Sequence, residues 1–126
     1  MATVFIADDS HLIQKRLINV LSDLEKIHVV GEAENGTEAI RRIRELKPEV
    51  VILDVCMAPG AGLDVLRSIK GDKSAPIVIM YTNHPFPQFR KKCIEYGADF
   101  FFDKTHEFTK LFLTLENLSQ SQTVCE

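Results

Sequence analysis

The sequence predicts an α/β fold, a doubly wound parallel sheet with helices on both faces. Five short apolar runs alternate with segments whose apolar residues recur at helical spacing, and no repeat or linker interrupts them. The run Val50–Leu53 is apolar throughout, which is typical of a strand covered by helices on both faces. Crossovers between parallel strands are nearly always right-handed, so this alternation favours one parallel sheet. A chain of 126 residues is expected to form one domain.

The apolar runs define the expected strands. They are residues 3–7, 27–33, 50–53, 76–81 and 99–102. The second run has polar residues between its apolar ones, which favours an edge position in the sheet. A helix is expected after each strand, and the last one is the clearest, with apolar residues at helical spacing up to Leu118. The predicted domain therefore covers residues 1–118, and residues 119–126 are expected to form a polar C-terminal tail.

Capping and stop signals set the expected ends of the helices. Ser10 can cap the first helix. Thr37 is the expected N-cap of the second helix, which should end before Pro48 because the residue preceding a proline avoids helical backbone angles. Pro87 suits the first turn of the fourth helix, and Gly97 suits its C-terminal stop.

Composition limits the cellular compartments and the classes of partner that are expected for this chain. The three cysteines, Cys56, Cys93 and Cys125, form no CxxC pair, so neither a disulfide framework nor a zinc site is indicated, and a cytoplasmic location is expected. No secretory signal is expected, because residues 1–6 have no basic segment followed by a long apolar one, and no apolar run approaches the roughly 20 residues that a membrane helix needs. A net charge of −3 gives no basic excess, which argues against nucleic acid as a direct partner.

Polar side chains follow four of the five expected strands. Asp8 and Asp9 follow the first, Asp54 the third, Thr82 the fourth and Lys104 the fifth. The carboxyl ends of parallel strands meet at one edge of a sheet, so these side chains are expected to cluster there. Three neighbouring carboxylates repel one another, and a hard cation with oxygen ligands, Mg²⁺, relieves that repulsion. Such a cation also neutralises phosphoryl oxygens, so Asp54 is expected to act as a nucleophile and to hold an acyl phosphate.

With these residues in place, the chain to about Leu118 resembles the receiver (CheY-like) domain of bacterial two-component response regulators. The matching residues occur in the family's order and spacing; they are Asp8, Asp9, Asp54, Met57, Gly62, Thr82 and Lys104. The resemblance implies a flavodoxin-like strand order of 2-1-3-4-5. It also implies phosphorylation of Asp54 by a phosphohistidine on a sensor histidine kinase or on a histidine phosphotransfer protein.

The resemblance further implies how the site holds its metal. Asp9 would bind Mg²⁺ directly, together with Asp54 and the backbone carbonyl of Cys56, and Asp8 would act mainly through water.

The resemblance also implies a switch. Thr82 and Lys104 would contact the phosphoryl oxygens, and Phe101 falls where the family has a rotating aromatic residue. Phosphorylation is then expected to draw Thr82 toward the phosphoryl group and to let Phe101 turn inward. The surface formed by the fourth helix, the fifth strand and the fifth helix would change shape and control a downstream protein.

Four positions depart from the family's usual pattern. Ala58-Pro59 places the loop proline one residue late, Asn83 replaces a small residue, and Thr105 stands where a proline is usual. Cys56 occupies a position that tunes water access to the site in the family. These departures leave the activity class unchanged and bear on loop shape and on phosphoryl lifetime.

Alternatives remain open for the wider context. The chain is either a stand-alone receiver or a fragment of a longer DNA-binding regulator, and the lack of a linker-like opening to the tail favours the first. A phosphorylation-dependent homodimer is a further alternative.

A different class of function is a Mg²⁺-dependent phosphohydrolase with an Asp nucleophile. That class usually has a second acid two residues after the nucleophile, where this chain has Cys56. A flavin-binding electron carrier of similar topology needs a Ser/Thr/Gly-rich loop after the first strand, where Asp8 and Asp9 stand. The chain is therefore expected to catalyse only its own phosphorylation and dephosphorylation.

Overall fold

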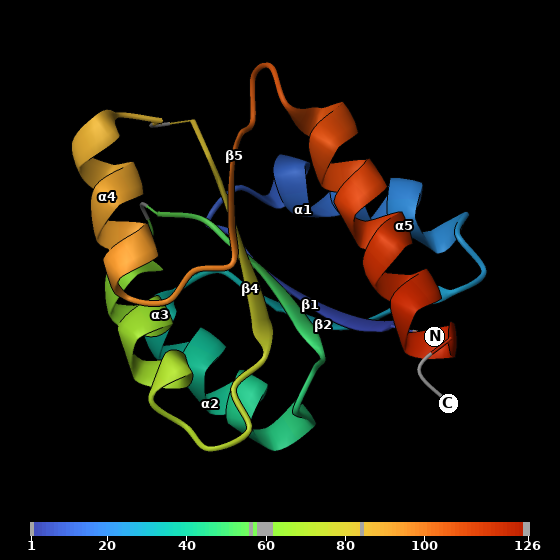
Figure 1. Cartoon of the computed structure of the whole chain (residues 1–126), viewed down its shortest axis with the longest axis horizontal. Helices are drawn as coiled ribbons and strands as arrows, with labels where there is room; N and C mark the ends of the chain where they lie inside the picture. Colours follow the sequence, from blue (N-terminus) through green and yellow to red (C-terminus); the bar gives the residue numbers. More distant parts are fainter. Residues whose placement is uncertain (1, 56, 58–61, 84, 125–126) are drawn as a thin grey trace.

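The computed structural model describes residues 2–55, 57, 62–83 and 85–124. Within these residues, five strands alternate with five helices (Figure 1). In chain order the elements are β1 (Ala2–Ala7), α1 (His11–Ser22), β2 (Ile27–Ala33), α2 (Gly36–Leu46), β3 (Val50–Leu53), α3 (Gly62–Lys70), β4 (Ile77–Thr82), α4 (Pro87–Glu95), β5 (Phe100–Asp103) and α5 (Phe108–Val124). Among the described residues, no helix is both long enough and apolar enough to cross a membrane.

The strands form one parallel sheet in the order β2-β1-β3-β4-β5. The predicted fold class and strand order are therefore confirmed. The second strand, β2, lies at an edge of the sheet, as its interspersed polar residues predicted. The buried strand β3 lies at the centre, between β1 and β4.

Two helical layers cover the sheet. Helices α2, α3 and α4 pack on one face, and α1 and α5 pack on the other (Figure 1). Successive side chains of β1 point to opposite faces, so Phe5 joins the core under α2–α4 and Ile6 joins the core under α1 and α5. Both side chains are fully buried, and each such burial stabilises the fold by about 1.5–3 kcal/mol.

The helix ends follow the capping signals with one exception. Ser10 caps α1, as predicted, and its side chain accepts a hydrogen bond from the backbone N–H of Ile13. The prediction that Thr37 caps α2 is wrong, because Asn35 has extended backbone angles and its side chain accepts from the N–H of Glu38 at 2.9 Å. Asparagine is the stronger cap of the two, so the helix begins earlier, at Gly36.

The C-terminal ends of α2 and α4 agree with the predictions. α2 ends at Leu46, and Lys47 adopts a left-handed conformation with φ 49° directly before the proline. α4 begins at Pro87, and Gly97 has φ 100°, a conformation that favours glycine.

Several boundaries differ from the predictions by small steps. β4 begins at Ile77 because the preceding proline has no N–H, whereas the N–H of Ile77 donates to the carbonyl of Glu49 at 3.0 Å. α5 continues beyond Leu118 to Val124, so most of the segment predicted as a polar tail is helical. Ser119 is buried and its hydroxyl donates to the carbonyl of Glu116 at 2.8 Å, which satisfies the polar group within the helix.

Candidate functional site

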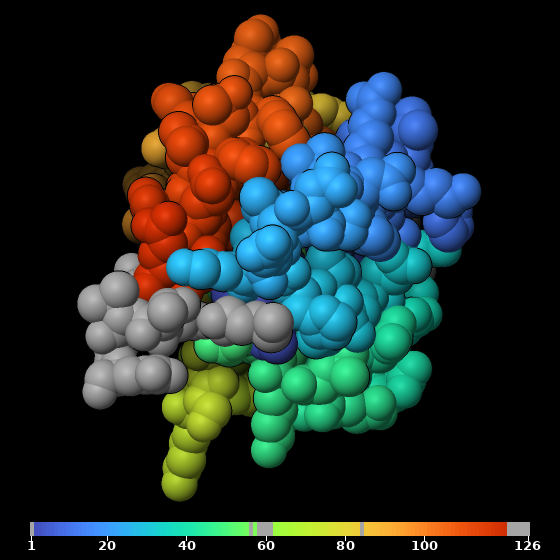
Figure 2. Space-filling view, turned by 90° about the vertical axis from the view of Figure 1, so that its right-hand side faces the viewer, coloured from blue at the N-terminus to red at the C-terminus, as the bar shows by residue number. Residues whose placement is uncertain are grey.

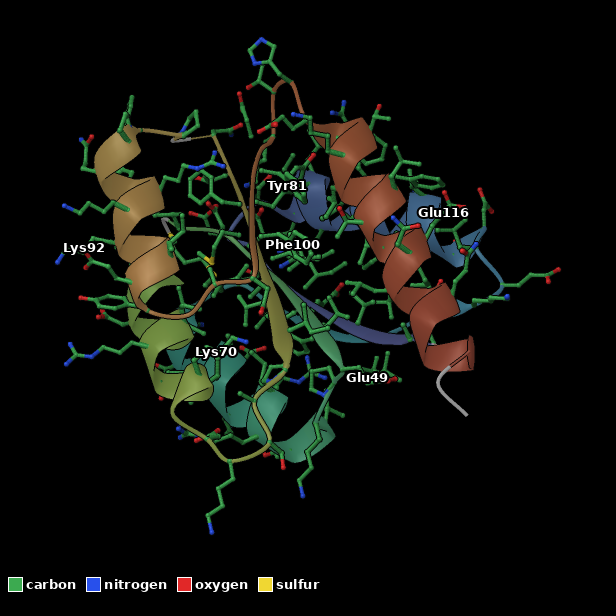
Figure 3. The ribbon with its side chains drawn as sticks, viewed as in Figure 1. Glu49, Lys70, Tyr81, Lys92, Phe100 and Glu116 are labelled. Atoms are coloured by element: carbon green, nitrogen blue, oxygen red, sulfur yellow. The ribbon has the colours of Figure 1, made fainter. Side chains whose placement is uncertain are left out.

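The polar residues that follow the strands meet at the carboxyl edge of the sheet. Figure 3 marks this edge by Tyr81, near the end of β4, and the opposite edge by Glu49, just before β3. Backbone hydrogen bonds continue the sheet one residue past three of the strands. They run from the N–H of Asp8 to the carbonyl of Ala33 (3.0 Å), from Asp54 to Ala7 (3.0 Å) and from Lys104 to Thr82 (2.9 Å). The backbones of Asp8, Asp54 and Lys104 are therefore fixed by hydrogen bonds to neighbouring strands of the sheet.

Three carboxylates converge at this edge. One oxygen each of Asp8, Asp9 and Asp54 lies within 4.8 Å of the others. Asp8 and Asp54 are buried, whereas Asp9 is exposed. Oxygen donors at this spacing, one of them open to solvent, suit a hard divalent cation such as Mg²⁺. The structure thus brings together the acidic residues that the sequence placed at one site.

The Lys104 ammonium lies between two of these carboxylates. Its Nζ is 2.5 Å from Oδ2 of Asp8 and 3.1 Å from Oδ2 of Asp54. The three side chains are nearly inaccessible, with 5%, 4% and 7% of their surfaces exposed, so little water screens these contacts. Three carboxylates and one ammonium leave a net charge of −2, which one divalent cation would balance.

Burial is the largest influence on the pKa of Asp8. It raises the pKa above the usual range for an aspartate because the charged form loses its hydration. Two hydrogen bonds act in the opposite direction: one from Lys104 and one, at 2.9 Å, from the backbone N–H of Ser10. The nearby charge of Asp54 adds to the increase. Desolvation therefore raises the pKa of Asp8, and the contact with Lys104 offsets part of that rise.

Thr82 and Phe101 lie where the switch was predicted. Thr82 is fully buried at the end of β4, beside Asp103 of β5. Phe101 is also buried and packs in the core under α2–α4. The guanidinium carbon of Arg90 on α4 stands 5.4 Å from the centre of the Phe101 ring, in cation–π contact. The inward orientation of Phe101 is therefore the one that this structure contains.

The departures from the family pattern fall in different places. Cys56 and Ala58-Pro59 lie outside the described residues, and Asn83 is exposed directly after β4. Thr105 uses the N–H that a proline would lack, donating to Oδ1 of Asp103 at 2.8 Å. This bond gives a physical reason why the β5–α5 connection accepts a threonine there.

Two further residues, Gln14 and Gly62, position the site, and physical reasoning from the sequence did not identify either of them. Gln14 of α1 is buried, and its side-chain NH₂ donates to the carbonyls of Asp8 (2.6 Å) and Ala33 (2.8 Å). It lies three residues before Leu17 on the buried face of α1, and that spacing is the signal that could have identified it. Gly62, matched only by family resemblance, opens α3 so close to the Asp54 carbonyl that any Cβ would collide with it.

A parallel sheet of order 2-1-3-4-5 with an acidic site and a buried lysine at its carboxyl edge defines a flavodoxin-like domain of the CheY type. The chain belongs to the response regulator receiver domain family, whose model matches residues 4–116. The resemblance to receiver domains is therefore confirmed, and the chain is a receiver domain of two-component signalling.

Curated relatives agree with this assignment. The chain is 34% identical over 105 residues to a protein-glutamate methylesterase/protein-glutamine glutaminase of Bacillus subtilis, covering 82% of this chain and 29% of that protein. It is 32% identical over 113 residues to a putative transcriptional regulator of Pseudomonas aeruginosa, covering 90% of this chain and 54% of that protein. The chain thus spans less than a third of the length of the first relative and about half of the length of the second.

Solved structures show the same fold. The response regulator domain of Thermotoga maritima CheB superposes with a TM-score of 0.84 at 25% identity, covering 96% of this chain and 95% of that one. CheY in a CheX–CheY–BeF₃–Mg complex from Borrelia burgdorferi also gives a TM-score of 0.84 at 25% identity, covering 93% of this chain and 88% of that one.

Proposed function

We propose that this receiver domain accepts a phosphoryl group on Asp54 from a phosphohistidine of a sensor histidine kinase or a histidine phosphotransfer protein. The observation that carries the proposal is the Lys104 ammonium, which contacts both Asp54 and Asp8 at a carboxylate cluster on the sheet edge. A buried ammonium beside a carboxylate would remain to neutralise new negative charge when that carboxylate becomes phosphorylated.

The chemical step is a displacement at phosphorus. A carboxylate oxygen of Asp54 attacks the phosphorus atom and forms an acyl phosphate. The P–N bond to the donor histidine breaks, and its electron pair stays on the ring nitrogen. The ring leaves as neutral imidazole because its other nitrogen carries the proton. Lys104 would pair with the phosphoryl oxygens, and the buried Thr82 hydroxyl would donate to one of them.

The carboxylate cluster fits Mg²⁺ in ligand type, spacing and charge. Asp9 and Asp54 would hold the ion, while Asp8, fixed by Lys104 and by the N–H of Ser10, would bind it through water. When bound, Mg²⁺ neutralises the oxygens of the transferring phosphoryl group. A metal in the complex of the similar Borrelia burgdorferi CheY supports this assignment. Asp9 is exposed, so the ion has a route from solvent.

The proposed output is a change at the surface formed by α4, β5 and α5. Phosphorylation would draw Thr82 toward the phosphoryl group and favour the buried position of Phe101, and Arg90 would follow the ring because the two are in contact. Exposed apolar side chains also occur at Phe86, which caps α4, at Ile94 on α4 and at Leu113 on α5, and such side chains suit contact with a downstream protein. We propose that phosphorylation shifts the populations of two arrangements of this surface.

Intact mass measurement tests the proposal. The protein is incubated with Mg²⁺ and a small acyl phosphate donor, and the expected product carries one added phosphoryl group. Asp54→Asn should abolish the gain, whereas Asp64→Asn, an exposed acid on α3, should leave it unchanged. Removal of Mg²⁺ by a chelator should suppress the gain in the unaltered protein. Persistent labelling of Asp54→Asn, or steady phosphate release from many phosphate esters, would contradict the assignment.

A further inference from the structure

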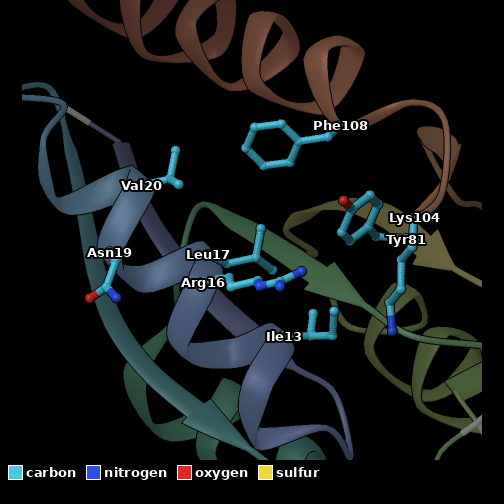
Figure 4. Close-up of a pocket in the computed structure, with 8 residues that line it drawn as sticks. All are labelled: Ile13, Arg16, Leu17, Asn19, Val20, Tyr81, Lys104 and Phe108. Carbon is cyan, nitrogen blue, oxygen red and sulfur yellow. The ribbon is translucent and has the colours of Figure 1, made fainter.

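A cleft of about 400 Å³ lies between α1 and α5, on the face of the sheet opposite α4 (Figure 4). Figure 2 views the molecule from this side and shows the two helices side by side. Apolar side chains from both helices line the cleft; they are Ile13, Leu17, Val20 and Phe108. Four polar side chains, those of Arg16, Asn19, Tyr81 and Lys104, complete the lining. The volume is near the lower end of the range of about 300–1,000 Å³ that is usual for small-molecule sites.

Tyr81 is the first sign that the cleft is a binding site. Only 5% of the residue is exposed, yet its hydroxyl makes no hydrogen bond with any part of the chain that the structure describes. Leaving a buried hydroxyl unpaired costs about 1–3 kcal/mol, so this hydroxyl is expected to bond a water or a ligand in the cleft. Figure 4 shows the hydroxyl directed into the cleft. Burial raises the pKa of Tyr81, and the charges of Asp103 and Asp8 raise it further, so the hydroxyl stays protonated and can donate.

Arg16 supplies the charged group of the cleft and is an exposed side chain of α1. Its guanidinium has neither an ion pair nor a hydrogen bond with the described residues. Figure 4 shows the guanidinium extending into the same space that the Tyr81 hydroxyl faces. A guanidinium binds a carboxylate through two parallel hydrogen bonds, and a phenol adds a third donor. The polar end of the cleft is therefore complementary to a carboxylate, and its walls are complementary to a hydrocarbon chain.

We propose that the cleft binds a small carboxylic acid with an apolar chain, of the size and chemistry of a medium-chain fatty acid. The carboxylate would face Arg16 and the hydroxyl of Tyr81, and the chain would lie along the apolar walls. Lys104 also lines the cleft, while its Nζ contacts Asp8 and Asp54 in the acidic site. A ligand in the cleft would thus touch a side chain that belongs to both sites.

Calorimetric titration with octanoate, without phosphodonor or Mg²⁺, tests the proposal and is independent of phosphorylation. The unaltered protein should bind one octanoate saturably with a Kd at or below about 1 mM. Arg16→Gln should weaken binding by about tenfold or more, and Tyr81→Phe by about threefold to tenfold. Tyr81→Phe should fold normally, because it removes only an unpaired oxygen. Lys15→Gln on the same helix and Tyr96→Phe after α4 are matched controls that should leave binding unchanged.

Three results would overturn the proposal. They are the absence of saturable binding by about 1 mM, equal affinities for octanoate and octanol, or the same affinity in Arg16→Gln and Tyr81→Phe as in the unaltered protein. Concentration-dependent dimerisation that Val20→Glu abolishes, without octanoate binding, would instead assign the cleft to a second copy of the chain.

Discussion

Replacing Lys104 by methionine tests how the acidic site is balanced. The substitution keeps the length of the side chain and removes the ammonium that lies 2.5 Å from Asp8 and 3.1 Å from Asp54. All three side chains are almost completely buried. The substitution therefore leaves two buried carboxylates without the close positive partner that Lys104 gives them among the described residues. Removing one member of a buried ion pair typically costs about 3–5 kcal/mol. Because Asp9 leaves part of the site open to water, we expect about 3 kcal/mol here.

Urea unfolding followed by circular dichroism, with a chelator present, measures this loss. With a denaturant slope of about 2 kcal/mol per molar, the midpoint should fall by about 1.5 M. Mg²⁺ should then stabilise Lys104→Met more than the unaltered protein, because the cation replaces the missing positive charge. Lys110→Met, an exposed lysine paired with Glu107, is the matched control and should change stability by less than about 0.5 kcal/mol. A loss below about 1 kcal/mol in Lys104→Met, with an unchanged slope, would refute this description of the site.

Three further predictions concern residues that support the site or the core. Gln14→Leu should cost about 2 kcal/mol in urea unfolding, because two buried strand-end carbonyls lose their donor; no measurable loss would argue against that role. Gly62→Ala should destabilise the protein by about 1–3 kcal/mol and slow phosphorylation, since its Cβ meets the Asp54 carbonyl, whereas Gly71→Ala has room and should be close to neutral. Burial raises the pKa of the Cys93 thiol to about 11, so a thiol reagent should label it only after unfolding. The raised pKa also means that the stability contribution of this thiol is intact below about pH 9 and falls by about 1.4 kcal/mol per unit between pH 9 and 11. A Cys93→Ala variant should lack that part of the decline.

The sequence predicted the strands and the site well because both depend on short local patterns. Continuous apolar runs identify strands that are buried on both faces, as at Val50–Leu53, and parallel strands necessarily bring their carboxyl ends to one edge. Asp8, Asp54 and Lys104 therefore lie together once the strands are assigned. Strand order depended on the family resemblance, because local patterns do not encode which strands are neighbours.

The features that the sequence did not reveal depend on tertiary contacts. Gln14 is a polar residue that normally faces solvent, and only its two carbonyl partners explain its burial. The helical extension from Ser119 to Val124 has no apolar periodicity, so its polar residues resembled a tail. Asn35 overrode Thr37 as the cap because the backbone reaches extended angles at the earlier residue. Tyr81 lies in an apolar run, and nothing in that run indicates that its hydroxyl faces a cleft.

Direct identification of the phosphorylated residue tests the central claim most closely. An acyl phosphate reacts with borohydride to give an alcohol, so a phosphorylated aspartate becomes homoserine, which peptide mass spectrometry locates. After incubation with a small acyl phosphate donor and Mg²⁺, we expect homoserine at position 54 and not at Asp8 or Asp9. The modification should be absent when a chelator replaces Mg²⁺. Homoserine at another aspartate, or none at position 54 in a protein whose intact mass has gained a phosphoryl group, would contradict the assignment of Asp54 as the phosphoacceptor.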